Sequence, residues 1–213
     1  MGRRTPLPVP GCLLVRQERN GMSILKRYAS LAAAAVAVLS VSLAGPASAE
    51  TTHSKAAFGA QARAAGLSQD AAKSLQAKVD HYLARHHGQQ VAANEIALAD
   101  GATLTVTVPG EKRVRDLSKP TGSRAATAQW ECSQDYFCMY RDVLGLGDRV
   151  ALYHCQDYAL QDWTGDGSYY NLQTRGTQAL FKNQNRTVID VTPAAPFSNA
   201  SYDWTPVWFV RPC

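Results

Sequence analysis

Residues 132–147, CSQDYFCMYRDVLGLG, contain the spacings that decide the fold class of this chain. Cys132 and Cys138 enclose five residues, so a disulfide between them would close a short loop and pin the first strand of the carboxy-terminal half. Six residues separate Tyr140 from Gly147.

Further strand-like runs follow, rich in Tyr, Phe, Trp and Val and separated by Gly, Asn, Asp and Pro. The predicted strands are residues 136–140, 149–153, 177–182, 187–191 and 207–210. Five or more short strands in about 85 residues predict an all-β sandwich or barrel. Residues 130–213 hold 15 of the 18 aromatic residues, which marks them as a domain of their own.

The first 49 residues are predicted to be a secretory signal peptide. Lys26 and Arg27 precede an apolar run over residues 31–44, and Ala-Ser-Ala precedes a cleavage site at Glu50. The run of about 14 residues is shorter than the ~20 that span a bilayer, so cleavage is favoured over a retained membrane anchor. Met22 is an alternative start. We expect a secreted, extracellular protein that is not on the membrane after cleavage.

Loss of the signal peptide changes the charge. The full chain carries +5, but residues 1–49 contain six basic residues and one acidic residue, so the remainder is neutral. A neutral chain gives no reason to expect nucleic-acid binding driven by counterion release. Residues 50–126 carry +3 and residues 127–213 carry −3, which permits weak docking of one half on the other.

Removal also takes Cys12 and leaves four cysteines: Cys132, Cys138, Cys155 and Cys213. Four cysteines in an exported chain predict two disulfides, with three possible pairings. The favoured pairing joins Cys132 to Cys138 and Cys155 to Cys213, the latter across a 57-residue loop. Both rival pairings leave the neighbours Cys132 and Cys138 unlinked.

Residues 50–108, here called the leader, are predicted to be a small α+β region or prosegment. A polar arm comes first, and then Ser68 caps a helix that ends at Gly88. Its apolar stripe is Ala72, Leu75, Val79, Tyr82 and Leu83. Apolar residues then alternate on both sides of Asp100-Gly101, which predicts a β-hairpin. One helix and one hairpin form only a small hydrophobic core. The leader is therefore expected either to pack against the other half or to serve as a prosegment.

Residues 109–129 are predicted to be an exposed linker, because they contain Pro120, Gly122 and few large apolar residues. Their basic cluster, residues 112–115, is expected to be solvated charge, and a processing site is the alternative.

The combined motifs resemble a known family. Tyr140 and Gly147 resemble the opening of a βγ-crystallin-type Greek key. With Cys-x5-Cys, WTGDGS at 163–168, NLQTRGT at 171–177 and WTPVW at 204–208, the chain is similar to the secreted bacterial peptidase inhibitor family thirty-six. The resemblance covers about residues 50–213. It implies a Greek-key sandwich that presents a rigid loop to an extracellular metalloproteinase, without catalytic residues or cofactors, and we expect a monomer.

The candidate inhibitory loop is residues 192–202, TPAAPFSNASY. Pro193 and Pro196 limit its flexibility, and Phe197 offers an apolar side chain to a thermolysin-like pocket. An ordinary turn with Phe197 packed inward is the alternative. The family's best-known member has its reactive bond within a second short disulfide loop. The second cysteine pair here is long-range, so the resemblance assigns no reactive bond to this chain.

Other chemistry has weaker support. Calcium ligands are sparse at residues 162–168 and 175–178, and His81, His86 and His87 lack the spacing of a zinc site, so no metal is expected. No catalytic motif of an enzyme is present. A non-inhibitory module that binds cell wall, carbohydrate or calcium is the alternative function. It would need an exposed patch of aromatic residues, drawn from Trp163, Tyr169, Tyr170, Trp204 and Trp208.

Overall fold

The computed structural model describes residues 47–118 and 130–213, with side chains from residue 55 onward. The charged and apolar parts of the predicted signal peptide, and the alternative start Met22, lie outside the described residues. The predicted cleavage site before Glu50 falls within the first described helix. Neither helix in the described part of the chain is long and apolar enough to cross a membrane.

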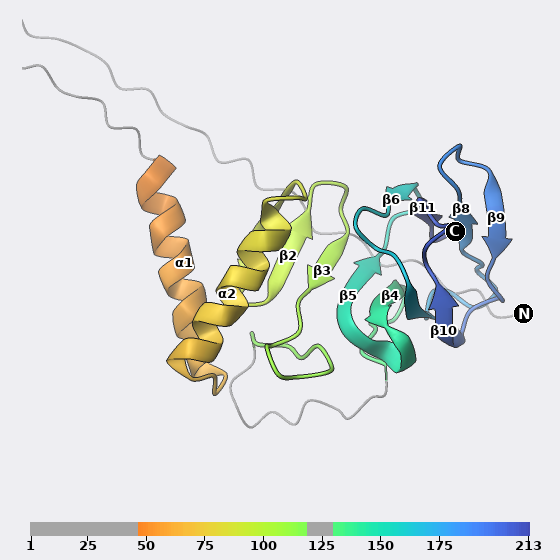
Figure 1. Ribbon diagram of the computed structural model, residues 1–213. Helices are drawn as coiled ribbons and strands as arrows, with labels where there is room; N and C mark the ends of the chain where they lie inside the picture. Colours follow the sequence, from red (N-terminus) through yellow and green to blue (C-terminus); the bar gives the residue numbers. More distant parts are fainter. Residues whose placement is uncertain (1–46, 119–129) are drawn as a thin grey trace, which may run out of the picture. The chain divides into compact units, whose positions relative to one another are not determined.

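Two helices open the described chain, α1 (Ala47–Ala64) and α2 (Gln69–Leu83), joined by a short turn and in contact with each other (Figure 1). The sequence predicted a polar arm before α2, and that prediction is wrong because α1 occupies this segment. The predicted start of α2 is confirmed, since the Ser68 hydroxyl accepts a 3.2 Å hydrogen bond from the backbone N–H of Ala71. The predicted apolar stripe places Leu75 and Val79 in the core.

The predicted helix end at Gly88 is wrong. Helix α2 ends at Leu83, and Gly88 is instead the first residue of β1 (Gly88–Ala92). A Cβ atom at position 88 would lie 2.7 Å from the carbonyl oxygen of Ala97. Gly88 therefore permits the close approach of the next strand and does not end the helix.

Residues 47–118 and 130–213 are mainly β and contain two antiparallel sheets, with the helical region before the strands as predicted. The first sheet has the strand order β1-β2-β3-β5-β4-β7-β10 and the second has the order β6-β11-β8-β9. In the first sheet the further bounds are β2 (Glu95–Leu98), β3 (Thr103–Thr105), β4 (Phe137–Asp142), β5 (Leu146–Leu152), β7 (Asp166–Asn171) and β10 (Phe197–Asp203). In the second they are β6 (Tyr158–Ala159), β8 (Leu180–Lys182), β9 (Val188–Val191) and β11 (Phe209–Arg211).

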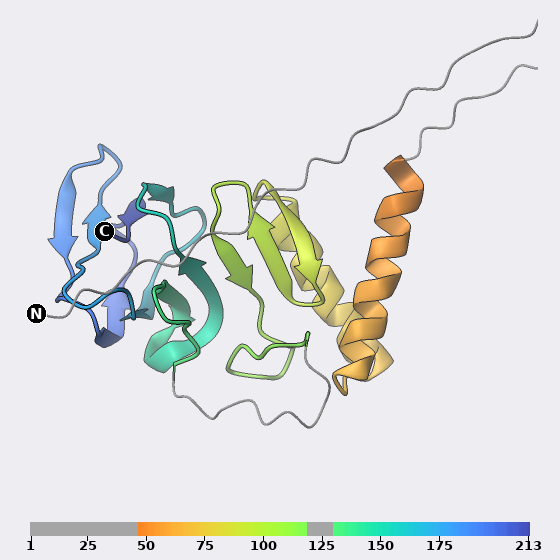
Figure 2. The ribbon, with the colours of Figure 1, turned by 180° about the vertical axis from the view of Figure 1, so that it is seen from behind.

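The leader hairpin is confirmed as β2 and β3, which pair antiparallel with Ile96 opposite Leu104. Helix α2 packs against β1 and β2, and Figure 2 shows these two strands from the other side with α2 behind them. Strand β3 also pairs with β5, with Leu104 opposite Val150. The leader therefore contributes strands to the same sheet as the carboxy-terminal half.

Strands β4 to β11 divide into two consecutive sets of four with the same arrangement. In each set the second, first and fourth strands are neighbours in one sheet, giving β5-β4-β7 and β9-β8-β11. The third strand of each set joins the other sheet, β6 beside β11 and β10 beside β7. The short 3-10 helix η1 (Val143–Gly145) connects β4 to β5. This exchange ties the two sheets together.

Aromatic side chains from both sheets fill the core. Phe137, Tyr169, Phe181 and Trp204 are all buried. The ring of Phe181 lies 5.5 Å from that of Tyr169 and 5.3 Å from that of Trp204. Since Tyr169 is in β7 and Phe181 in β8, this cluster joins the two sheets.

Residues 109–118 of the predicted linker are mostly exposed but are held to the fold at several points. Val114 and Leu117 are buried there. The buried Asn94 side chain donates a 2.9 Å hydrogen bond to the carbonyl of Arg115, and the backbone N–H of Gly147 donates one of 2.8 Å to the carbonyl of Lys112. This segment therefore packs against the leader and β5, while residues 119–129 lie outside the described residues.

Candidate functional site

The cysteines adopt the pairing that the sequence favoured. Cys132 is bonded to Cys138, with a Cα–Cα distance of 5.8 Å, and Cys155 to Cys213, with a Cα–Cα distance of 5.3 Å. The first bond closes the short loop before β4, and the second ties residue 213 to the segment after β5.

Tyr140 and Gly147 lie in the β4–β5 hairpin. Tyr140 is fully buried, its hydroxyl donates a 2.9 Å hydrogen bond to the carbonyl of Glu131, and burial raises the pKa of the phenol. Gly147 has a φ of +77°, and a Cβ atom there would lie 2.7 Å from the Oδ2 atom of Asp142. Position 147 therefore requires glycine for both its backbone conformation and the space around it.

The candidate inhibitory loop is shorter than predicted. Strand β10 begins at Phe197 and continues to Asp203, so residues 198–202 are not loop. Phe197 pairs with Asn171 of β7, and this long-range pairing holds a polar sequence in an extended conformation. Residues 192–196 remain between β9 and β10, and we call them the anchored loop.

Thr192 anchors the first end of this loop. It is 1% exposed, its backbone N–H donates a 2.9 Å hydrogen bond to the carbonyl of Ala179, and its hydroxyl accepts one of 2.8 Å from the Ala179 N–H. The Gln178 side chain donates a further 2.8 Å hydrogen bond to the Thr192 carbonyl. The start of the loop is thus held by three hydrogen bonds to the segment before β8.

Ala195 anchors the second end. It is buried, and its N–H donates a 2.8 Å hydrogen bond to the carbonyl of Thr177 while its carbonyl accepts one of 3.0 Å from the Gly176 N–H. The side chain of the buried Asn171 donates a 2.9 Å hydrogen bond to the same Thr177 carbonyl. The loop is therefore pinned at two buried positions by a segment that is itself held in place.

Between and after the anchors the chain faces solvent. Pro193, Ala194, Pro196 and Phe197 are exposed. The Phe197 side chain is 37% exposed, and its ring lies 6.3 Å from the buried Tyr169 ring, so it packs partly inward and leaves part of its surface open to solvent. The predicted residues Pro196 and Phe197 lie side by side at the end of a fixed turn.

The sequence did not predict that the strand before this loop exposes several apolar side chains. Strand β9 is at the end of the second sheet, paired with β8. Its Val188, Ile189 and Val191 side chains are all exposed, and with Phe197 we call them the apolar edge. The mostly apolar residues 188–191 predict a strand. The one sequence feature that indicates an edge strand is that the turn residues 183–186 come directly before it.

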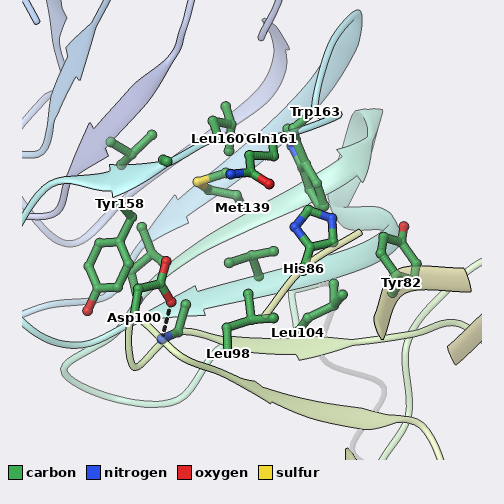
Figure 3. Close-up of a pocket in the computed structure, with 15 residues that line it drawn as sticks. Tyr82, His86, Leu98, Asp100, Leu104, Met139, Tyr158, Leu160, Gln161 and Trp163 are labelled. Carbon is green, nitrogen blue, oxygen red and sulfur yellow. Dashed lines mark hydrogen bonds between the residues drawn. The ribbon is translucent and has the colours of Figure 1, made fainter. Parts of the chain in front are cut away.

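A second feature is a small cavity between leader and carboxy-terminal residues (Figure 3). Its volume is about 40 Å³, and its walls include Leu98, Leu104, Met139 and Leu152, with His86 also lining it. Burial lowers the pKa of His86. A cavity of this size has room for a few water molecules.

The other candidate residues do not gather into a site. Among the described residues, no group of three or more His, Cys, Asp or Glu side chains is placed to hold a metal ion. The carboxylate of Asp162 pairs with Arg85 at 3.2 Å. Of the aromatic residues considered for a binding patch, Trp163, Tyr169 and Trp204 are buried, Tyr170 is half-buried and Trp208 is 48% exposed.

Comparison with known proteins adds no assignment: no protein-family model, curated protein or solved structure matches the chain.

Proposed function

We propose that this protein is a secreted protease inhibitor, directed at extracellular metalloproteinases, and that it presents the anchored loop and Phe197 to the protease. The observation that carries the proposal is the alternation along the loop. Thr192 and Ala195 are buried and hydrogen-bonded, while Pro193, Pro196 and Phe197 are exposed.

Inhibition of this kind is binding without productive turnover. A flexible segment must be ordered when it binds, at a cost of roughly 0.5–1.5 kcal/mol for each immobilised side chain. Here the backbone at Thr192 and Ala195 is already held, and prolines restrict positions 193 and 196. The loop would therefore bind a protease cleft without most of this ordering cost.

The apolar edge supports the same role. Extended peptides commonly bind by adding a strand to a partner, with alternate side chains entering pockets. Strand β9 is extended, lies at a sheet end and carries exposed Val188, Ile189 and Val191. Thermolysin-like proteases, the expected targets, would receive the apolar ring of Phe197 in their substrate pocket.

The strand order supports the finer fold that the sequence predicts, a crystallin-type Greek-key sandwich. In a Greek key the fourth strand returns to lie beside the first. Strand β7 lies beside β4, and β11 lies beside β8. Each set of four sends its third strand to the other sheet, and we propose that the two sets are Greek-key motifs packed face to face.

Export is proposed on two grounds. Residues 26–49 have the charged, apolar and Ala-x-Ala parts of a signal peptide. The two disulfides are of the kind that persist in oxidising compartments. The alternative, a non-inhibitory carbohydrate-binding or cell-wall module, loses support because Trp163, Tyr169 and Trp204 are core residues.

The test is the inhibition constant of the full chain against a thermolysin-like metalloproteinase. Phe197→Ala should weaken inhibition about three- to sixfold, since only the 37% of the side chain that is still exposed can be newly buried, and full burial is worth roughly 1.5–3 kcal/mol. The matched control is Tyr153→Ala, an exposed aromatic residue directly after β5. Equal effects of the two variants, or no inhibition by the full chain at micromolar concentration, would reject the proposal.

A further inference from the structure

A buried carboxylate joins the leader to the carboxy-terminal half. Asp148, in β5, is 4% exposed. Its Oδ1 atom accepts hydrogen bonds of 2.7 Å from the Lys78 ammonium, 2.8 Å from the Thr107 N–H and 2.7 Å from the Thr107 hydroxyl. Its Oδ2 atom accepts one of 2.6 Å from the Tyr82 hydroxyl. All of these donors belong to the leader.

The donors are themselves fixed by the leader's fold. Lys78 and Tyr82 are one helical turn apart in α2, so both side chains emerge on the same face. Thr107 follows β3, and its hydroxyl also accepts a 2.8 Å hydrogen bond from Lys78. Helix and hairpin together form the binding site for the carboxylate, and neither element forms it alone.

Backbone pairing continues the contact along β5. Strand β3 pairs antiparallel with β5, from Thr103 opposite Ala151 to Thr105 opposite Arg149. The Arg149 guanidinium donates a 2.8 Å hydrogen bond to the Thr105 hydroxyl. In the sheet order, β5 has β4 on its other side, so without β3 it would be the edge strand of the carboxy-terminal half.

Apolar packing accompanies the pairing. Leu104 of β3, Met139 of β4 and Leu152 of β5 are all at most 2% exposed and belong to one buried cluster. Separation of the halves would expose these side chains together with the unpaired β5 backbone. Exposed apolar edge strands are the usual starting point of aggregation.

We propose that the leader is a strand-donating folding module for the carboxy-terminal half, which binds the β5 edge and is recognised there by Asp148. The partner that fits this surface is thus the chain's own leader, residues 50–108, together with the adjoining residues 109–118, acting in cis. The folding role depends on the contacts of β5, whereas the inhibitor proposal depends on β9 and β10. An experiment can therefore reject either proposal without rejecting the other.

The chain offers a matched control for Asp148. Asp162 also pairs with a leader cation, Arg85, but both side chains of that pair are more than half exposed. Exposed ion pairs contribute little, whereas removal of one partner from a buried hydrogen-bonded charge is costly. Asp148→Asn and Asp162→Asn therefore make the same chemical change at a buried and at an exposed contact between the halves.

The experiment uses the full chain with a recognition sequence for a specific protease inserted within residues 119–129. The folded protein is cut, and the dissociation constant of the cut complex is measured by serial dilution at constant pH, without first separating the fragments. We expect submicromolar affinity, a loss of at least about tenfold with Asp148→Asn and less than about threefold with Asp162→Asn. Equal losses would overturn the role of Asp148.

A second measurement tests the folding role. The cut chain is unfolded in denaturant with its disulfides intact, the fragments are separated, and the fragment that begins after the cut is refolded with and without residues 50–118. We expect soluble, folded protein only when the leader fragment is present. Equal recovery without it would overturn the proposal, whatever the result of the inhibition assays.

Discussion

The Asp148 carboxylate accepts a 2.6 Å hydrogen bond from the hydroxyl of Tyr82, a residue 66 positions earlier in the chain. Burial and the neighbouring carboxylate raise the pKa of Tyr82. The pKa of Asp148 is held below its ordinary value: burial raises it, but hydrogen bonds from Lys78, Tyr82 and Thr107 lower it by more. A negative charge is therefore stabilised inside the contact between leader and carboxy-terminal half.

This contact should make the stability of the chain sensitive to acid. A carboxyl whose pKa is lower when folded contributes stability above its unfolded pKa, and that contribution is lost as the pH falls through the folded pKa. Between about pH 5 and pH 2, the unfolding free energy should fall more steeply for the natural chain than for Asp148→Asn. Chemical denaturation at several pH values measures this, and parallel curves would contradict it.

His86 should add a separate step at higher pH. Burial lowers its pKa, so the unfolded chain binds a proton more readily than the folded one, and stability should fall as the pH drops below the ordinary histidine value of 6.5. His86→Gln should flatten the stability profile between about pH 7 and pH 5. The control is His81→Gln, and an identical slope in both variants would refute the assignment.

Gly147→Ala should destabilise the chain by about 2 kcal/mol or more, because it combines a strained positive φ with a steric clash. Gly165→Ala is the control, since Gly165 also has a positive φ, of +81°, but has no atom within 4 Å of an added Cβ. Denaturant unfolding of both variants measures the difference. A cost for Gly147→Ala no larger than that of the control would be inconsistent with the clash at Asp142.

Thr192→Val tests whether the anchors of the loop matter for inhibition. The change keeps the shape of the side chain but removes the hydroxyl that accepts from the Ala179 N–H, at a cost of about 1–3 kcal/mol for the unsatisfied group. Inhibition should weaken about tenfold if the loop becomes mobile, with the chain still folded. Thr174→Val, at an exposed position, should leave inhibition unchanged, and equal inhibition by both variants would argue against anchoring.

Much of the architecture follows from local sequence signals. Helix α2 is predictable because Ser68 and the apolar stripe lie within one short stretch. Strands β7 and β10 are not predictable in this way, because their residues are typical of turns. They become strands only because β10 pairs with β7 and β7 pairs with β4. Gly167 illustrates this, since a Cβ atom there would lie 2.5 Å from the Nε1 atom of Trp204, far away in sequence.

The candidate site is predictable to a similar extent. Pro196 and Phe197 stand out by residue type, but Thr192 and Ala195 become anchors only because residues 176–179 are folded against them. Asp148 directly follows Gly147 without any local feature to mark it, and its donors lie as far as 70 residues away. The opposite net charges of the two halves were the available hint that they dock.

The central claim, that the anchored loop and the apolar edge contact the protease, is tested most directly by amide hydrogen exchange. The full chain is measured alone and with a saturating amount of a catalytically inactive thermolysin-like protease. We predict protection concentrated in residues 188–203, with unchanged exchange in residues 88–108 of the leader. Absence of protection in residues 188–203, or protection centred on another part of the chain, would contradict the account.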